Sequence, residues 1–415
     1  MQEEQENQLN QLVLKMFDET VYAYEIALAE MEFFSLYGSE INIPFELLTE
    51  GVIEVPNIDS QQNRILIERL AYYEKVGREF THQKYLTEVQ GAIVGSHAKA
   101  YMTHWIYPYK GKFHPQMIRA LLNIIGAKRG DVLLDPMTGS GTLNVESRLL
   151  GIDSIGIDAL PIGVLASKVK CFALDSDFGK FLEEVDTQRV IGDRLVTHTN
   201  QIPEAVLEGI ENPQVQDFFR LLYFETVSIS KLPKRKFHEV WKKISGYYVR
   251  TVEQSIEIIE KLGIELGNAQ IQLGDARSLE LKDESVNHII TSPPYAIAID
   301  YVVRNTDQLG MMGYSTKEIY DKTIGLRGKG GARISNYYSD LDKSIHEMFR
   351  VMKRGGYCVI LIGDTQFEKQ TLPTISKAIW YAESAGFKLV HNIPKVSAGR
   401  FGLFRTERIL MFQKL

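Results

Sequence analysis

Short apolar runs alternate with segments of helical periodicity over most of the chain after residue 100. Five short runs predict strands: 131–135, 154–158, 271–275, 286–292 and 356–364. Apolar residues at helical spacing predict three helices: 114–126, 143–151 and 341–353. Two final runs, 388–395 and 408–414, have the pattern of a closing antiparallel pair. Strands that alternate with helices predict an α/β fold with a parallel, doubly wound sheet.

Two parts of the chain depart from this alternation. In the first hundred residues, helical patterns at Asn7–Glu30 and Gln61–Phe80 flank a stretch with Pro44 and Pro56 that predicts loop and short strand. More than a hundred residues separate the second predicted strand from the third, whereas a crossover needs only about a dozen. The additional residues have a mostly helical pattern, which predicts an inserted subdomain.

The pattern therefore predicts four regions along the chain. They are an N-terminal accessory region at 1–100, the first part of the α/β domain at 101–175, a mostly helical insertion at 176–265 and the second part of the α/β domain at 266–415. We expect the insertion to serve in target recognition.

Composition excludes several classes of protein. The 415 residues are 44% hydrophobic and 24% charged, with a net charge of −6, which is typical of a globular protein. No apolar run reaches the ~18 residues of a membrane helix, and the N-terminus lacks a signal-peptide pattern. We therefore expect a cytoplasmic protein without a membrane partner. Cys171 and Cys358 lie in separate apolar runs, which predicts core packing and no metal site.

A glycine-containing loop follows the first predicted strand. The sequence DPMTGSGT runs from Asp135 to Thr142 and leads into a helix. Gly139 and Gly141 allow a sharp turn and close approach of a ligand, and the helix N-terminus offers free N–H groups. The same glycines also fit a tight turn without function. Because Asn144 interrupts the pattern GxGxxG, the loop does not favour a nicotinamide or flavin cofactor.

Acidic residues end the next two predicted strands. Asp158 follows the second strand, where a carboxylate can accept hydrogen bonds from ribose hydroxyls. Asp275 follows the third strand, where it can accept a bond from the amino group of an adenine ring. Either residue alone fits a helix cap or a turn. Together with the loop they indicate a nucleoside-containing ligand at the carboxyl edge of the sheet.

The fourth predicted strand ends in the tetrapeptide Ser292-Pro293-Pro294-Tyr295. Two prolines fix two backbone φ angles and remove two N–H donors, so the carbonyls of Ser292 and Pro293 project as rigid acceptors. The Ser292 hydroxyl is a further acceptor and Tyr295 supplies a planar face. A proline-rich turn explains the tetrapeptide equally well when it is considered alone.

This set of groups suits methylation of an aromatic amine. The lone pair of such an amine is delocalised into the ring, and two acceptors that grip its hydrogens can free that lone pair. No covalent enzyme intermediate is needed, because the work is positioning and electrostatics. Tyr295 would stack on a base swung out of the duplex.

With these motifs the chain resembles the S-adenosylmethionine-dependent amino-methyltransferases of nucleic acids. That family carries a D-P-x-x-G-S-G-T cofactor motif and an S/D/N-P-P-Y catalytic motif on a seven-stranded Rossmann-like fold. The likeness extends to 109–122, 353–364 and 405–414. It implies S-adenosylmethionine as cofactor. The implied cofactor-site residues are Lys112, Phe113, His114, Asp135, Pro136, Thr138, Gly139, Gly141, Thr142, Asp158, Asp275 and Ala276.

The resemblance also bears on the target base. A serine before Pro-Pro-Tyr is similar to enzymes that act on N4 of cytosine, whereas Asp or Asn is commoner among enzymes for N6 of adenine. The order of the two motifs is shared with adenine enzymes and with RNA guanine-N2 methyltransferases. We expect N4 of cytosine in double-stranded DNA with base flipping, with a cognate restriction endonuclease as a candidate partner in a restriction–modification system. A tRNA guanine-N2 enzyme and a DNA adenine-N6 enzyme are the alternatives.

Two basic segments are candidates for nucleic-acid contact. Segment 231–243 interleaves Phe237 and Trp241 with basic residues, and segment 325–338 follows the catalytic motif with glycines that suit a mobile lid. The predicted phosphate contacts are Lys234, Arg235, Lys236, Arg327, Lys329 and Arg333. A solvated helix face and an ordinary exposed loop are the alternative explanations.

Overall fold

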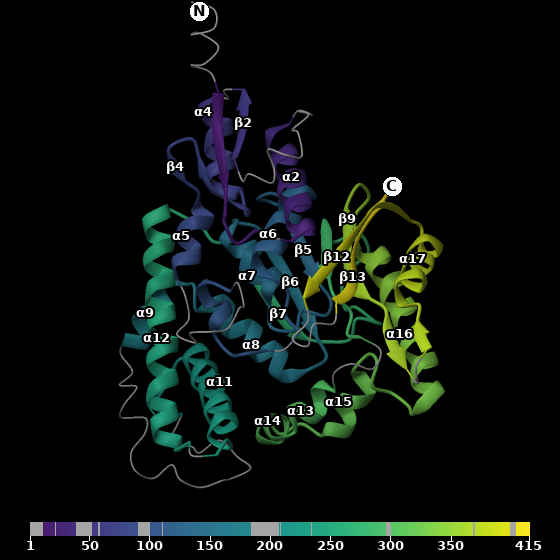
Figure 1. Cartoon of the computed structure of the whole chain (residues 1–415). Helices are drawn as coiled ribbons and strands as arrows, with labels where there is room; N and C mark the ends of the chain where they lie inside the picture. Colours follow the sequence, from purple (N-terminus) through teal and green to yellow (C-terminus); the bar gives the residue numbers. More distant parts are fainter. Residues whose placement is uncertain are drawn as a thin grey trace, which may run out of the picture.

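A computed structural model of the chain shows a central seven-stranded sheet in the order β12-β13-β9-β8-β5-β6-β7 (Figure 1). It describes residues 11–20, 22–38, 52–56, 59–89, 100–109, 111–183, 207, 209–233, 235–295, 300–367, 370–398 and 404–415. The strands are β5 (Val132–Asp135), β6 (Asp153–Asp158), β7 (Ala269–Leu273), β8 (His288–Thr291), β9 (Tyr357–Gly363), β12 (Phe387–Ala398) and β13 (Phe404–Lys414). The predicted α/β fold with a Rossmann-like seven-stranded sheet is confirmed.

Pairing of these strands follows the sequence prediction closely. β5 pairs in parallel with β6 and β8, β6 with β7, and β8 with β9. β13 is antiparallel to both β9 and β12, which confirms the predicted closing pair. The central strands are apolar because both of their faces are covered: Leu133, Leu134, Ile289 and Ile290 are fully buried.

Helices cover the two faces of the sheet (Figure 1). They are α6 (Pro115–Ile124), α7 (Thr142–Leu149), α8 (Pro161–Phe172), α16 (Gly330–Val351) and α17 (Thr374–Ala385). A short 3-10 helix, η1 (Met102–Trp105), precedes α6. A two-stranded ribbon of β10 (Thr365–Phe367) and β11 (Gln370–Leu372) precedes α17. The predicted helices at 114–126 and 143–151 are confirmed. None of the described helices is long and apolar enough to cross a membrane.

The described residues of the N-terminal region form a separate four-stranded sheet with helices beside it. The elements of this region are β1 (Gln11–Met16), α2 (Ala23–Tyr37), β2 (Val52–Pro56), α4 (Ser60–Arg69), β3 (Tyr73–Val76), β4 (Glu79–Phe80) and α5 (His82–Glu88). The predicted helix at Asn7–Glu30 is wrong over β1, and the predicted helix at Gln61–Phe80 is wrong beyond Arg69. β1 is a strand because it pairs with β2 and β3, which are distant in sequence.

The N-terminal region shares a core with the methyltransferase-like sheet. Leu14, Leu28 and Phe33 belong to the same buried cluster as Leu121 and Ile409. A buried carboxylate on α2 joins the two parts: Glu32 accepts from the backbone N–H groups of Ala71 and Tyr72 and from the Asn123 amide of α6. The accessory region therefore packs firmly against one face of the α/β domain.

The described residues of the segment predicted as an insertion are mostly helical, and they do not form a core of their own. The segment contains α9 (Ser176–Glu183), α11 (Pro213–Ser230) and α12 (Phe237–Leu262). Their buried side chains join those of α8 and of three short helices that follow the catalytic tetrapeptide. These short helices are α13 (Tyr301–Arg304), α14 (Thr306–Met311) and α15 (Thr316–Lys322). The insertion and the segment after the catalytic tetrapeptide therefore form one helical lobe.

Two expectations about the basic segments are wrong. α16 begins at Gly330, so residues 330–338 form its first turns and are not a mobile loop. Trp241 is fully buried and stacks on Phe219 and Phe237, so it serves the core of the lobe and cannot contact a nucleic acid. Burial of this large aromatic ring in the core of the lobe stabilises the fold more than exposure on the basic surface would.

Candidate active site

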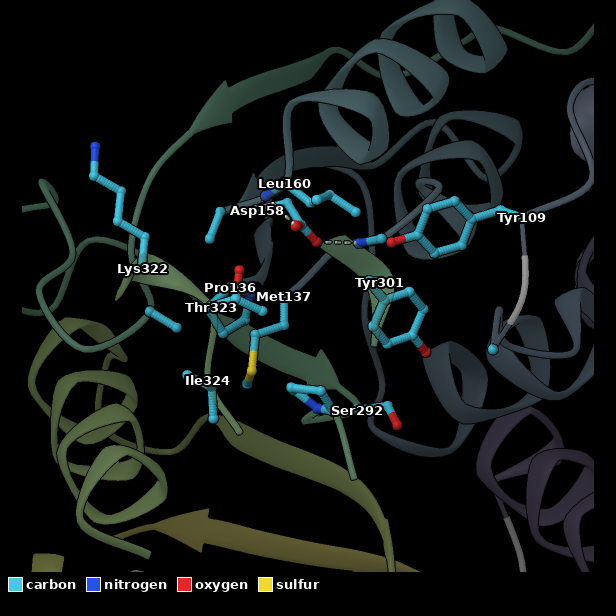
Figure 2. Close-up of a pocket in the computed structure, with 15 residues that line it drawn as sticks. Tyr109, Pro136, Met137, Asp158, Leu160, Ser292, Tyr301, Lys322, Thr323 and Ile324 are labelled. Atoms are coloured by element: carbon cyan, nitrogen blue, oxygen red, sulfur yellow. Dashed lines mark hydrogen bonds between the residues drawn. The ribbon is translucent and has the colours of Figure 1, made fainter. Parts of the chain in front are cut away.

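The carboxyl ends of β5, β6, β7 and β8 meet at one edge of the sheet and surround a cavity (Figure 2). The hollow encloses about 630 Å³ when the open solvent at its mouth is counted. Its lining residues are Tyr109, Gly111, Pro136, Met137, Gly139, Asp158, Ala159, Leu160, Ala276, Ser292, Pro294, Tyr301, Lys322, Thr323 and Ile324. The cofactor loop and the catalytic tetrapeptide therefore border one space.

The loop after β5 is shaped by its two glycines. Gly139 has φ of +54° and Gly141 has φ of +77°, which side chains other than glycine rarely adopt. A Cβ on Gly141 would lie 2.9 Å from Ser167 of α8, so this helix can pack directly against the loop. Thr138 donates to the Asn144 side chain at 2.6 Å, and Thr142 is buried in the first turn of α7. The loop is thus held in a fixed, open curve.

Asp158 at the end of β6 lies in the cavity wall beside that loop. Its carboxylate accepts from the backbone N–H groups of Gly139 at 2.7 Å and Leu160 at 2.8 Å (Figure 2). Removal from water raises the pKa of Asp158 to about 6, against the two backbone hydrogen bonds. A carboxylate with lone pairs left over at the cavity wall fits the ribose hydroxyls of a nucleoside-containing cofactor.

We expect Asp158→Asn to weaken binding of S-adenosylmethionine by roughly 10- to 100-fold. The reason is that the two hydrogen bonds expected from the ribose hydroxyls to this carboxylate lose the assistance of its negative charge. In the native protein the dissociation constant should rise as pH falls through about 6, since protonation removes the same charge. The variant should lack this dependence.

Calorimetric titration from pH 5 to 8 measures both effects. Asp153→Asn is the matched control, because Asp153 lies at the opposite end of the same strand and binds Asn268. Equal affinity of native protein and Asp158→Asn at pH 8 would remove Asp158 from the site.

Asp135 connects the cofactor loop with the catalytic strand. Its fully buried carboxylate accepts from the Thr291 hydroxyl of β8 at 2.7 Å and from the Met137 N–H at 3.1 Å. Burial raises its pKa to about 7, although the Thr291 hydrogen bond opposes this. Its second oxygen, Oδ2, is buried without a hydrogen-bond partner among the described residues. Asp135 is not among the residues that line the cavity, so it acts by tying the cofactor loop to β8.

Asp275 after β7 does not line the cavity, although its neighbour Ala276 does. Arg277 binds the Asp275 carboxylate through Nε at 2.9 Å and Nη2 at 2.6 Å. Burial favours the neutral acid, but these hydrogen bonds lower the pKa of Asp275. Arg277 also donates to the fully buried Asp340 at 3.1 Å and to the carbonyl of Asp321 at 3.1 Å.

Arg277 thus holds together the two walls of the cavity formed by residues 275–277 and 321–324. We expect Arg277→Met to raise the dissociation constant for S-adenosylmethionine by roughly tenfold or more, since Asp275 and Asp340 lose their shared partner. Arg354→Met is the control, because the Arg354 side chain is 75% exposed at the far end of the domain. Unchanged binding by calorimetry in both variants would contradict this role.

The catalytic tetrapeptide lies at the end of β8. The Ser292 hydroxyl donates to the carbonyl of Leu361 on β9 at 3.0 Å, and Ser292 and Pro294 line the cavity. Tyr295 is not among the lining residues, and its hydroxyl donates to Glu407 on β13. Glu407 also pairs with Lys395 of β12. The tetrapeptide therefore presents its serine to the cavity and its tyrosine to the adjoining strands.

The segment before α6 reaches the cavity through residues that the sequence did not single out. Lys112 donates to the His104 carbonyl at 2.9 Å, and burial lowers its pKa to about 8. Phe113 packs on the N-terminal core, and His114 caps α6. The lining instead includes Tyr109 and Gly111, together with Tyr301. The sequence signal for such residues is an aromatic residue in a glycine-containing loop, which is too common to identify them.

Five of the six predicted nucleic-acid contacts lie among the described residues, and they fall into two groups. Arg235, Lys236 and Lys329 are exposed, while Lys234 lies outside the described residues. Arg327 pairs with the buried Asp340, and Arg333 donates to the Gly325 carbonyl at 2.6 Å. Arg327 and Arg333 therefore stabilise the turn before α16. Only the guanidinium N–H groups that these bonds do not use are left to contact a ligand.

Comparison with known proteins supports the character of this site. Residues 106–240 match the family described as RMKL-like, methyltransferase domain. A type II methyltransferase, M.BsoBI of Geobacillus stearothermophilus, is 41% identical over 83 residues, or 20% of this chain and 15% of the relative. A tRNA (guanine(10)-N2)-dimethyltransferase of Methanothermobacter thermautotrophicus is 33% identical over 248 residues, or 59% of this chain and 45% of the relative. The chain thus spans less than half of these two relatives.

Among solved structures, a SAM-dependent methyltransferase from Methanosarcina mazei superposes with a TM-score of 0.33 and 11% identity, covering 70% of this chain and 94% of the other. Residues 106–240 of the chain thus match a methyltransferase domain and form part of a Rossmann-like sheet, and the cofactor that this match supports is S-adenosylmethionine. The matches also confirm the resemblance, drawn from the two motifs, to the S-adenosylmethionine-dependent amino-methyltransferases of nucleic acids.

Proposed function

We propose that the protein transfers a methyl group from S-adenosylmethionine to an exocyclic amino group of a nucleic-acid base, with N4 of cytosine in DNA as the first candidate. The observation that carries the proposal is the shared cavity. Gly139 and Asp158 of the cofactor side and Ser292 and Pro294 of the catalytic tetrapeptide line the same hollow. A cofactor held on one side would therefore face an amine held on the other.

The residues of the chain have separate tasks in this proposal. The cofactor supplies a methyl group on a sulfonium centre, ready for in-line displacement. Asp158 and the loop around Gly139 bind the methyl donor. Asp135 holds this loop against β8 through its hydrogen bond with Thr291. Ser292 and the Pro293 carbonyl accept the amine hydrogens, which directs the nitrogen lone pair toward the methyl group. The nitrogen gains the methyl group and releases one proton to solvent.

The target in DNA is supported by Ser292 at the first position of the tetrapeptide and by the type II methyltransferase M.BsoBI among the relatives. Partnership with a cognate restriction endonuclease, base flipping from double-stranded DNA and a cytoplasmic location belong to this proposal. Exposed Arg235, Lys236 and Lys329 are its candidate phosphate contacts.

A second candidate is methylation of guanine N2 in tRNA. Two tRNA (guanine(10)-N2)-dimethyltransferases, from Methanothermobacter thermautotrophicus and Methanocaldococcus jannaschii, are 33% and 32% identical to this chain over 248 and 104 residues. The folded N-terminal region offers such an enzyme a further surface beside the α/β domain. Adenine N6 in DNA is the remaining alternative.

One experiment separates these candidates. The protein is incubated with labelled S-adenosylmethionine and, separately, with unmethylated genomic DNA and with unmodified tRNA, and the nucleosides are analysed by mass spectrometry. We expect N4-methylcytosine in the DNA sample. N2-methylguanosine in the tRNA sample alone would favour the second candidate, and no methylated nucleoside in either sample would contradict the proposed function.

A further inference from the structure

Tyr301 brings an aromatic ring to the cavity beside the catalytic serine. Tyr301, Ser292 and Pro294 line the same hollow, and in Figure 2 Tyr301 lies between Tyr109 and Ser292. The tyrosine of the tetrapeptide itself, Tyr295, is absent from the lining and donates its hydroxyl to Glu407. The first residue of α13 therefore supplies an aromatic surface to the cavity that Ser292 lines.

Two neighbours fix the position of this ring. Tyr301 stacks on Tyr109, with ring centroids 6.0 Å apart and planes 11° apart. Its hydroxyl lies over Gly111, where an added Cβ would be 2.5 Å from the hydroxyl oxygen and 3.7 Å from Cζ. Gly111 has φ of +77°, so glycine is needed there both for the backbone and for the close approach. The ring is thus held before any ligand enters.

The stacked pair reaches across the cavity. Tyr109 lies against the cofactor loop, because a Cβ on Gly139 would be 3.3 Å from its ring. Tyr301 lines the cavity together with Ser292, and in Figure 2 it lies between Tyr109 and Ser292. Burial raises the pKa of Tyr301, so its hydroxyl stays protonated and its ring neutral at physiological pH. A neutral, flat and preorganised ring beside a hydrogen-bond acceptor is suited to a planar base whose amine points to that acceptor.

We propose that Tyr301 is the residue on which the target base stacks while Ser292 holds its amino group. This assignment rests on the proposed function and names the group that receives the base. It predicts a residue that governs binding and presentation of the nucleic acid and leaves binding of the cofactor unaffected.

The test compares Tyr301→Ala, Tyr301→Phe and the native protein on whichever polymer the native protein methylates. Loss of base stacking should raise KM for that polymer about 5- to 150-fold in Tyr301→Ala. Tyr301→Phe keeps the ring and should retain most of the native KM. The dissociation constant for S-adenosylmethionine, measured by calorimetry without nucleic acid, should stay within about threefold in both variants. Tyr314→Ala, which removes a 37% exposed tyrosine of the same lobe, is the control.

A second pair of variants tests the position of the ring without removing it. Gly111→Ala should raise KM as Tyr301→Ala does, because the new methyl group pushes the Tyr301 hydroxyl away. Adding Tyr301→Phe removes that hydroxyl and leaves Cζ at an ordinary contact distance of 3.7 Å. The double variant should therefore bind its polymer better than Gly111→Ala alone, a rescue that general damage to the fold would not produce.

The outcomes separate the inference from the function on which it rests. If the native protein methylates neither DNA nor tRNA, the proposed function fails and the assignment of Tyr301 fails with it. If the native protein is active and Tyr301→Ala keeps the native KM, the proposed function stands and the assignment is wrong. If Tyr301→Ala loses cofactor affinity as strongly as methyl transfer, Tyr301 belongs to the cofactor wall and the assignment is also wrong.

Discussion

Ser292→Ala is expected to lower kcat for methyl transfer by roughly 10²- to 10³-fold, the range seen when one preorganised hydrogen-bonding group is removed from an active site. The reason lies in the direction of its hydroxyl. The Ser292 hydrogen is committed to the Leu361 carbonyl at 3.0 Å, so the lone pairs of the same oxygen remain to accept from an amine in the cavity. Alanine keeps the backbone carbonyl and the fold of the turn but removes this acceptor.

The prediction is checked by single-turnover kinetics together with calorimetry. Binding of S-adenosylmethionine should be unchanged, because the hydroxyl is needed only when the amine reacts. Ser315→Ala is the control, since the exposed Ser315 precedes α15 without a side-chain capping bond. Native rates in Ser292→Ala would overturn its catalytic role. Loss of cofactor binding would place the hydroxyl in the cofactor site instead.

Arg119→Met is expected to lower the free energy of unfolding by about 3–5 kcal/mol, as when one partner of a buried ion pair is removed. Arg119 on α6 donates to Glu146 of α7 at 2.9 Å, and His104 of η1 lies 2.8 Å from the other oxygen of that carboxylate. All three side chains are buried. Burial lowers the pKa of His104 to about 4, so its ring is neutral and cannot replace the lost positive charge.

Urea denaturation at pH 7 measures this effect. Arg129→Met is the matched control: its ion pair with Glu265 is 62% and 78% exposed at the two side chains, and exposed pairs contribute only about 0–1 kcal/mol. Equal unfolding free energies for the two variants would show that the buried triad is not needed for stability. The expected difference would show that η1, α6 and α7, which support the cofactor loop, are held together by this carboxylate.

The sequence predicted the α/β domain well because its signals are local. β5 and β9 are largely buried, so each is a nearly continuous apolar run that can be recognised without knowledge of its neighbours. In the N-terminal region the signal is weaker. β1 has the sequence QLVLKM, and only its pairing with β2 and β3, tens of residues later, makes it a strand. A helical pattern was the natural but wrong interpretation.

The candidate site shows the same difference between features with a local sequence signal and features that depend on distant segments. The motifs at 135–142 and 292–295 were found from the chain alone, because glycine, proline and acidic residues have specific backbone and hydrogen-bonding properties at strand ends. The roles of Arg277, Tyr109 and Tyr301 were not found. Arginine and tyrosine are common residues, and each acquires its role only from partners that the fold brings near, such as Asp340 and Gly111.

By itself, then, the sequence determined the class of fold and, through the resemblance of its motifs, the cofactor and the candidate loops of the site, since these depend on residue type and on order along the chain. Only the tertiary structure decided which side chains face the cavity. It turned Tyr295 toward Glu407, placed Tyr301 beside Ser292 and took Trp241 into the core of the lobe. Side-chain direction depends on packing between segments that lie far apart in the chain, and no local pattern records it.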